Sequence, residues 1–389
     1  MQTKQFWIFK FLVFLVVFIC LPLPHGNIYP FVALIAACVY RAKNYPVNYE
    51  MLDRGLIIFF IWGLASTLWA VDVSMSLKLY GKVVCVIMGG WIWLSTYQQF
   101  NQDKQRTLQN LTFIAGLSLL VSLLILVINL KFNGQLFKLI DDHVSPALVH
   151  ACIACSLAIW LALAQLARWL QVCISLLAMW VFQQASSDAS ALGMLLGAAV
   201  LVMHKYFPRL LKITFIYGMP LVWCFIPFVF RILQPEHYRQ WAHFLDPSNI
   251  HRLFIWDSVT NQIFERFLTG FGFGSSRFQD FGLKSEEVHI VIDNSRHIFC
   301  APVHAHNFML QIWLELGAIG VMLASLAWIL YWQRQYHKSD SYYIAFWGSI
   351  LCVAATNISI WQSWWLFLVV VLLPMYTKRT SSYGFSKNN

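Results

Sequence analysis

Apolar segments long enough to cross a lipid bilayer follow one another along most of the chain, with short polar stretches between them. A helix rises about 1.5 Å per residue, so roughly 20 apolar residues cross a ~30 Å hydrocarbon core. The pattern predicts about twelve spanning helices, at residues 6–24, 27–40, 55–71, 80–97, 108–130, 146–165, 169–185, 189–204, 210–230, 307–331, 342–358 and 360–376. The second, seventh and eighth of these windows are short for a spanning helix.

A single long hydrophilic segment interrupts this pattern. It divides the chain into nine helices over residues 1–230, a loop over 231–306, three helices over 307–376 and a tail over 377–389. The composition agrees, because 59% of the residues are hydrophobic and only 11% are charged, whereas about a quarter of a water-soluble domain is charged. We therefore expect an all-α polytopic membrane protein, with no internal repeat of the kind that two-halved transporters carry.

The basic residues predict the orientation. With a cytoplasmic N-terminus, sixteen Lys and Arg residues fall in short inside segments, and only four fall in short outside loops: Lys78, Lys82, Lys131 and Lys138. This asymmetry follows the positive-inside rule, so we expect both termini inside and the loop 231–306 outside. The net charge of +10 is then a topology signal and does not indicate nucleic-acid binding. The first apolar segment lacks a clean cleavage site, and we expect it to stay as a helix.

The outside loop contains an amphipathic pattern. In RLFIWDSVTNQIFERFL the apolar residues that share one helical face are Leu253, Trp256, Val259, Ile263 and Phe267. A helix there is expected to lie on the membrane or to cap the bundle.

Cys300 is the one cysteine of nine in this loop, so no disulfide can close within it. The C-x-x-C of Cys152 and Cys155 lies in a span, where we expect a structural role.

Loop and helix meet at HAHNFMLQIWLELG, residues 304–317. His306 and Asn307 can cap the helix, or the imidazole can exchange a proton near neutral pH. Gly317 is eleven residues further and returns to nearly the same helical face, where it would let a neighbouring helix approach. Glu315 points to the opposite face about 13 Å into the span, and an acid at that depth must face protein or water.

Several motifs together resemble the O-antigen ligase and polymerase superfamily. They are His-Asn followed nine residues later by glycine, and the segment RLFIWDSVTNQIFERFLTGFGFGSSRF, in which an arginine and a tryptophan precede a Gly-x-Gly-x-Gly turn. The plan of about twelve spans with a large periplasmic loop before the His-Asn helix also matches. The motifs cover residues 186–320, and the resemblance implies a GT-C-like glycosyltransferase of the bacterial inner membrane with its active site on the periplasmic face.

The resemblance also implies roles for individual residues. A glycan would pass from undecaprenyl diphosphate to an acceptor hydroxyl, with inversion at the anomeric carbon and without metal or other cofactor. Arg252 would hold the diphosphate through paired charge-assisted bonds. His306 would act as general base on the acceptor hydroxyl or position it. Asn307 and Trp256, from the same motifs, are expected to bind substrate beside them.

The chain departs from the family in one middle helix. Where the family commonly has an arginine after serines, the sequence reads QQASSDASALG, with Asp188 and no cation. Asp188 either caps the next helix together with Ser187 or orients His306 through a hydrogen bond. The missing phosphate-binding charge could come from Lys78 and Lys82, four residues apart on one helical face. Arg277 and Arg296 are further candidates, with solvated loop charges as the alternative.

Two other polar stretches are not expected to form sites. The GFGFG run follows no strand and opens no βαβ unit, so it is not a nucleotide loop, and we expect a turn at the membrane surface. DDHVSPALVH contains ligand-type side chains, but a metal site needs a second cluster at a defined spacing.

We therefore expect an O-antigen ligase that joins O-polysaccharide to the lipid A core. A polymerase and a protein oligosaccharyltransferase use the same donor and remain alternatives. The short segment of thirteen residues after the last span favours the ligase modestly. A lipid or glycan transporter would need polar residues along the bundle interior, and a purely structural role would make His306 and Arg252 dispensable. The expected partners are the lipid-linked donor, the lipid A core acceptor and membrane lipids, with no nucleic acid.

Overall fold

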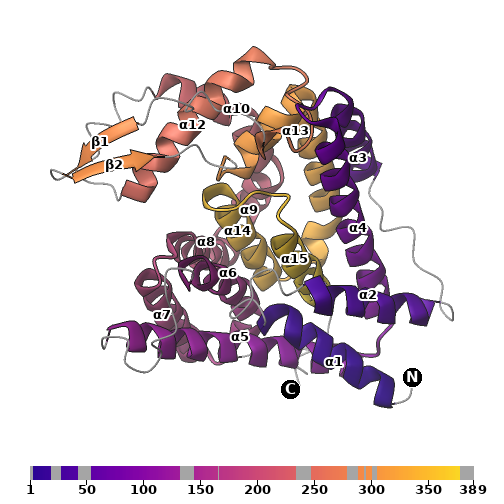
Figure 1. Cartoon of the computed structure of the whole chain (residues 1–389). Helices are drawn as coiled ribbons and strands as arrows, with labels where there is room; N and C mark the ends of the chain where they lie inside the picture. Colours follow the sequence, from indigo (N-terminus) through magenta and orange to yellow (C-terminus); the bar gives the residue numbers. More distant parts are fainter. Residues whose placement is uncertain are drawn as a thin grey trace.

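The computed structural model describes residues 3–18, 28–42, 54–131, 144–164, 166–233, 247–277, 288–292, 295–299 and 305–376. Its helices are α1 (Thr3–Phe18), α2 (Ile28–Ala42), α3 (Arg54–Ser66), α4 (Val73–Gln98), α5 (Gln102–Lys131), α6 (Val144–Leu163), α7 (Arg168–Gln184), α8 (Asp188–Tyr206), α9 (Pro208–Ile213), α10 (Met219–Ile232), α12 (Pro247–Glu265), α13 (Phe308–Gln335), α14 (Ser341–Thr356) and α15 (Ser363–Tyr376). Figure 1 shows their arrangement.

A helix lies at each of the twelve predicted windows, with α9, a π-helical turn at Thr214–Gly218 and α10 sharing the ninth. Five described helical stretches are long and apolar enough to cross a membrane: Val73–Gln98, Gln102–Ile128, Asp188–Tyr206, Pro208–Ile232 and Phe308–Gln335. The protein is therefore a polytopic membrane protein. The number of spans and the division at residues 230, 306 and 376 stay predictions.

The long hydrophilic loop is not entirely helical. Its apolar pattern forms α12, as predicted, but strands β1 (Val288–Ile292) and β2 (Ser295–Phe299) form an antiparallel hairpin that pairs Val288 with Phe299. The segment VHIVIDNSRHIF favours a hairpin, because its first run is rich in β-branched residues, its second run contains Ile and Phe, and the Asp-Asn pair between them consists of residue types that favour turns. Figure 1 shows the hairpin beyond α12 at the edge of the molecule.

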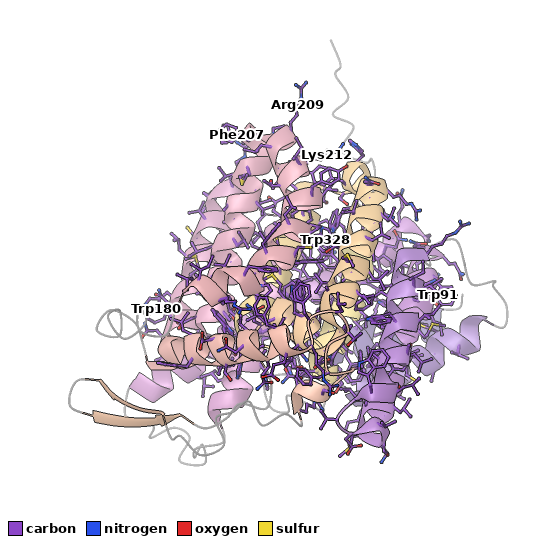
Figure 2. All side chains as sticks on the ribbon, turned by 90° about the horizontal axis from the view of Figure 1, so that it is seen from above. Trp91, Trp180, Phe207, Arg209, Lys212 and Trp328 are labelled. Atoms are coloured by element: carbon purple, nitrogen blue, oxygen red, sulfur yellow. The ribbon has the colours of Figure 1, made fainter. Side chains whose placement is uncertain are left out.

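The hairpin and the basic segment formed by the end of α8 and by α9 lie at opposite ends of the bundle. Figure 2 labels Phe207, Arg209 and Lys212 at one end, with the hairpin at the other. The sequence places these two segments on opposite sides of the membrane, so the arrangement agrees with the predicted topology. Which end faces the cytoplasm stays a prediction from the basic residues.

Small residues let α8 and α14 pack closely. Gly193 and Gly197 are four residues apart on α8, and a Cβ at Gly193 would lie 3.4 Å from the carbonyl oxygen of Ser349 on α14. The Ser349 hydroxyl donates to the Gly193 carbonyl at 2.7 Å and accepts from the Trp160 indole at 2.7 Å. In a membrane, where lipid is as apolar as the side chains, such close packing and hydrogen bonding replace the hydrophobic effect in joining helices.

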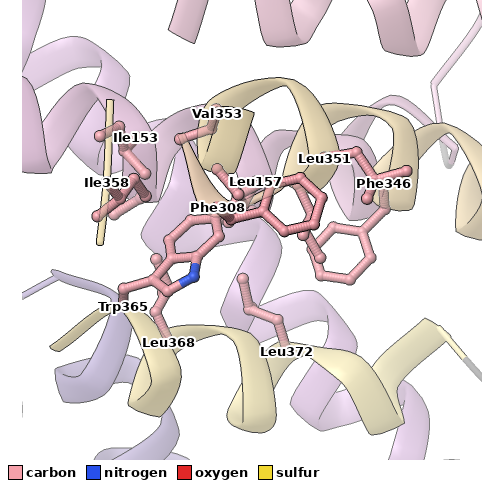
Figure 3. Packing of buried hydrophobic residues seen from close by; sticks show 14 of the residues in the cluster. Ile153, Leu157, Phe308, Phe346, Leu351, Val353, Ile358, Trp365, Leu368 and Leu372 are labelled. Atoms are coloured by element: carbon pink, nitrogen blue, oxygen red, sulfur yellow. The ribbon is translucent and has the colours of Figure 1, made fainter. Parts of the chain in front are cut away.

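The core next to this contact is built from α6, α14 and α15. Its side chains are fully or almost fully buried, and Figure 3 shows them in contact around Phe308, the first residue of α13. Those labelled are Ile153, Leu157, Phe346, Leu351, Val353, Ile358, Trp365, Leu368 and Leu372. The start of α13 is therefore anchored in the interior of the bundle.

We expect Gly197→Ala to lower the stability of the detergent-solubilised protein by about 1–3 kcal/mol, the usual cost of overpacking a core. The added Cβ would lie 2.2 Å from the Trp160 ring and 2.9 Å from the Ser349 hydroxyl. Gly81→Ala on α4 is the matched control, because no atom lies within 4 Å of its Cβ. Thermal unfolding followed by fluorescence measures both, and equal melting temperatures for the two variants would contradict the packing described.

Candidate functional site

His306 and Asn307 form the N-terminus of α13. Asn307 is the N-cap, and its side-chain oxygen accepts from the amides of Met309 at 3.0 Å and Leu310 at 3.2 Å. His306 has a φ of +48°, in the left-handed region. A left-handed conformation costs a residue with a Cβ about 1–2 kcal/mol, so the surrounding contacts must hold it. Such strain occurs preferentially at functional sites.

Helix α12 contacts the residue before His306. The Trp256 indole donates to the Ala305 carbonyl at 3.0 Å. Arg252 precedes Trp256 by four residues and Val259 by seven, so all three share one helical face. Because Val259 is fully buried and Trp256 contacts the start of α13, that face points into the bundle. The structure thus brings Trp256 to the start of α13, next to His306 and Asn307, and Arg252 lies one helical turn before Trp256 on the same face of α12.

The His306 ring is oriented by a main-chain group. Its Nδ1 lies 3.0 Å from the carbonyl oxygen of Asn357, which directly follows α14. A carbonyl can only accept, so this hydrogen bond requires the proton on Nδ1. In the neutral imidazole Nε2 then carries the lone pair that can take a proton. The orienting bond that sequence reasoning offered to Asp188 is made instead by the Asn357 carbonyl.

Helix α13 is interrupted below this site, at Gly317. Gly317 has φ +64° and ψ −170°, so the helical bonds across it are lost. The glycine-rich turn that follows α12 replaces them: the amides of Phe271 and Gly272 donate to the carbonyls of Leu314 and Glu315 at 2.9 and 2.8 Å. In return, the amides of Ala318 and Ile319 donate to the carbonyls of Phe267 and Leu268, at 2.8 and 3.2 Å.

One expectation about these glycines is corrected. Gly317 does not continue one helical face beneath His306, because it needs a positive φ, and the segment that approaches it is the glycine-rich turn and not a helix. A Cβ at Gly317 would lie 2.4 Å from the Leu268 carbonyl oxygen. The GFGFG run forms a turn, as expected, and this turn is buried inside the protein, with Phe273 only 1% exposed; its place at the membrane surface stays a prediction.

Glu315 faces protein, as an acid at that depth requires. It is fully buried, and its carboxylate accepts hydrogen bonds from the glycine-rich turn, from Gln311 and from Trp361. It is the one fully buried Asp, Glu, Lys or Arg among the described residues. Sequence reasoning had Glu315 on the opposite face from His306 and gave it no partner.

Three of the other proposed cations, Lys78, Lys82 and Arg277, are exposed. Lys78 and Lys82 are exposed on α4, which begins seven residues earlier than predicted because Asp72 caps it through a 2.9 Å bond from the Met75 amide. Arg277 is exposed at the end of a short 3-10 turn. Arg296 belongs to β2, but its side chain lies outside the described residues. These positions leave the second phosphate-binding charge unassigned.

The SSDAS stretch forms the turn between α7 and α8. Ser187 occupies the N-cap position, but its hydroxyl contacts the Ser190 hydroxyl at 2.8 Å and caps no amide. Asp188 is exposed in the first turn of α8, where a negative charge favours the helix dipole. Ser186 has a φ of +52°. Within the described part of the chain, Ser186 and His306 are the two non-glycine residues with positive φ.

Sequence reasoning missed an acid beside this site. Burial raises the pKa of the Asp257 carboxyl above its usual range, because desolvation disfavours the charged form. Asp257 directly follows Trp256 on α12.

No group of three metal-ligating side chains occurs in the described residues, and Asp141, Asp142 and His143 lie outside them. Cys152 and Cys155 are buried free thiols.

Comparison with known proteins identifies the region that contains these residues. Residues 172–325 match the family model described as O-Antigen ligase. The chain carries an O-antigen ligase family domain. That domain includes α12, the glycine-rich turn and the first part of α13, and so contains Arg252, Trp256, His306 and Asn307, whereas Asn357 lies beyond it.

Three proteins similar to the chain are each named "putative polysaccharide ligase". The one from Rickettsia conorii is 26% identical over 83% of this chain and 79% of its own length. The one from Rickettsia felis is 26% identical over 86% and 83% of the two chains, and the one from Rickettsia prowazekii 25% over 83% and 80%. The similarity therefore extends to most of the chain beyond the O-antigen ligase domain. No solved structure matches significantly.

Gly317→Ala is expected to prevent normal folding or to destabilise the protein by more than about 2 kcal/mol, since it adds left-handed strain and a clash with main chain. Gly218→Ala is the control, because its φ is −66° and its nearest neighbours would lie at an ordinary 3.6 Å. The yield of monodisperse protein and its melting temperature are the measurements. A Gly317→Ala protein as stable as Gly218→Ala would show that α13 is not interrupted as described.

Proposed function

We propose that the protein transfers a preassembled O-polysaccharide from undecaprenyl diphosphate to a sugar hydroxyl of the lipid A core on the periplasmic face of a bacterial inner membrane. The observation that carries the proposal is the hydrogen bond between Trp256 and the Ala305 carbonyl, which joins the Arg252 face of α12 to the residue before His306. In this proposal, Arg252 supplies a cation that suits a diphosphate and His306 an imidazole that suits proton transfer, and the two share one site.

The reaction needs three events at this site. His306 Nε2 takes the proton of the acceptor hydroxyl, whose oxygen forms the new bond to the anomeric carbon of the donor sugar. The bond from that carbon to the diphosphate oxygen breaks, and the diphosphate leaves with the electron pair. Attack opposite the leaving group inverts the configuration. Arg252 stabilises the charge that grows on the leaving diphosphate, because its guanidinium fits phosphate oxygens in pairs.

Asn307 and Trp256 support the same site in this proposal. Asn307 keeps the start of α13 in place through its cap, and the exposed part of Trp256 offers an aromatic face to a sugar ring. A second cation for the diphosphate would come from Lys78, Lys82, Arg277 or Arg296. Asp188, at the start of α8, is proposed to contact the acceptor.

A transporter is not favoured by any observation. It needs polar or charged groups along the bundle interior, whereas Glu315 is the one fully buried charged residue among those described, and its partners are structural segments of the protein.

The test is complementation of a strain in which this gene is deleted. We expect His306→Ala and Arg252→Ala to give core-only lipopolysaccharide together with long glycan accumulated on the lipid carrier, since both variants block the transfer and not glycan assembly. Gel analysis of lipopolysaccharide and chromatography of the lipid-linked glycan measure this. Short chains of a single repeat would indicate a polymerase, and the loss of modified proteins with a normal ladder would indicate a protein oligosaccharyltransferase.

Two variants control for loss of a histidine and of an arginine as such. His204→Ala changes a residue near the end of α8, and Arg168→Ala changes an exposed residue at the start of α7. Both belong to segments predicted to be cytoplasmic and are expected to restore the full ladder. A normal ladder with His306→Ala and Arg252→Ala as well would leave the protein with a structural role.

Arg252→Lys separates charge from geometry. A lysine keeps the positive charge but cannot make the paired, planar contacts of a guanidinium. We expect it to restore at most about a tenth of the wild-type transfer rate, equal to a loss of about 1.4 kcal/mol or more in transition-state stabilisation. Full activity with lysine would mean that Arg252 acts only through its charge.

A further inference from the structure

The buried carboxylate of Glu315 is the centre of a hydrogen-bond network. Its Oε2 accepts from the Gly274 amide at 2.8 Å and from the Trp361 indole at 2.7 Å. Its Oε1 accepts from the Ser276 hydroxyl at 2.5 Å and from the Gln311 amide group at 2.9 Å. All four partners are donors, and an ionised carboxylate is a pure acceptor with room for four such bonds.

These bonds join three segments that are distant in sequence. Gly274 and Ser276 belong to the glycine-rich turn, Gln311 to the first turn of α13, and Trp361 to the connection between α14 and α15. Gln311 strengthens the third link, because its amide nitrogen donates to the Ser359 hydroxyl at 3.1 Å and its oxygen accepts from the Ile360 amide at 3.2 Å.

The α14–α15 connection is also the segment that orients His306. Asn357, whose carbonyl lies 3.0 Å from His306 Nδ1, is two residues before Ser359 and four before Trp361. Of the contacts just described, those of Gln311 and Glu315 are the ones that tie residues 359–361 to α13. The Asn357 carbonyl that His306 contacts therefore lies within four residues of the groups through which the network holds the connection to α13.

We propose that Glu315 is a positioning residue for His306. By holding residues 359–361, it keeps the Asn357 carbonyl against Nδ1, and so keeps the ring in the tautomer that leaves Nε2 for the acceptor hydroxyl. The effect of Glu315 on the His306 tautomer is argued from these contacts alone. The importance of that tautomer for the reaction rests on the proposed function.

Glu315→Gln tests the link with almost no change in volume. A glutamine replaces one acceptor oxygen by an NH₂ group. That group then faces either Gly274 and Trp361, which can only donate, or Ser276 and Gln311, of which the Ser276 hydroxyl can turn to accept. An unpaired buried donor costs about 1–3 kcal/mol, so at least one contact must separate. We expect the 359–361 segment to shift, and the bond between the Asn357 carbonyl and His306 to weaken.

The primary measurement is ¹⁵N NMR of the full-length protein, labelled at histidine and reconstituted in lipid. The His306 signals are assigned by their loss in His306→Gln. In the wild type we expect protonated Nδ1 and unprotonated Nε2. In Glu315→Gln, and in Trp361→Phe, which removes one donor and keeps a ring against Phe273, we expect the other tautomer to appear. An unchanged His306 tautomer in both variants overturns the proposal, and Trp361→Phe decides alone if Glu315→Gln does not fold.

Trp328→Phe is the matched control for a purely structural loss. It removes a buried indole hydrogen bond of 2.9 Å, to the Phe215 carbonyl, from a later turn of the same helix. We expect it to leave the His306 tautomer unchanged. A tautomer shift in Trp328→Phe equal to that in Glu315→Gln would also overturn the proposal, because any loosening of α13 would then act on His306.

Transfer rates for the same proteins separate this inference from the proposed function. With lipid-linked glycan and lipid A core as substrates, Glu315→Gln is expected to lower kcat about tenfold or more and to change KM little, within the roughly 10²–10⁴-fold that positioned proton transfer contributes. A wild-type protein with the expected tautomer but no transfer would refute the proposed function and leave the link intact. A tautomer shift without loss of kcat would overturn the positioning role.

Discussion

Main-chain hydrogen bonds across the break at Gly317 are the constraint on which the site depends. A helix interrupted at membrane depth leaves amides and carbonyls that water cannot reach, and such backbone is tolerated only where protein satisfies it. The turn after α12 supplies both kinds of partner at once, since its carbonyls accept from Ala318 and Ile319 and its amides donate to Leu314 and Glu315. The turn can approach this closely because Gly270 and Gly317 lack side chains.

This exchange fixes α12 as well. The helix is tied to α13 at its C-terminal end by the turn and near its middle by the bond from Trp256 to the Ala305 carbonyl. Aromatic rings pack beside these two links. The ring centroids of Phe267 and Trp313 of α13 are 5.1 Å apart, and those of Phe264 and Phe228 of α10 are 5.4 Å apart. An extramembrane loop would ordinarily be mobile, but here the residues that would handle substrate stand on an element held by the spanning helices. A site on such an element is more precise than one on a loop.

How far the sequence could predict this structure differs between its parts. Hydropathy located all twelve helical windows, because each helix must hide its own backbone from lipid. Periodicity located α12, since Val259 and Ile263 recur at helical spacing on the buried face. The break in α13 was missed because helical geometry was extended through Gly317, and nothing in residue types marks a glycine that needs a positive φ. The partners of His306 and Glu315 were missed for another reason: Asn357 acts through its carbonyl, and every residue has one.

The strain at His306 follows from these same contacts. Asn307 must cap α13, Ala305 must present its carbonyl to Trp256, and His306 must turn its ring towards the Asn357 carbonyl. A residue between a fixed carbonyl and a fixed cap has little freedom in its own backbone, and its φ of +48° is the conformation in which all three contacts are present. The packing of Phe308 and the network of Glu315 stabilise that conformation from the bundle side. In the proposed reaction, a histidine held in this way would lose little further conformational entropy when the acceptor reaches it, which is the advantage that preorganisation gives to a proton-transfer group.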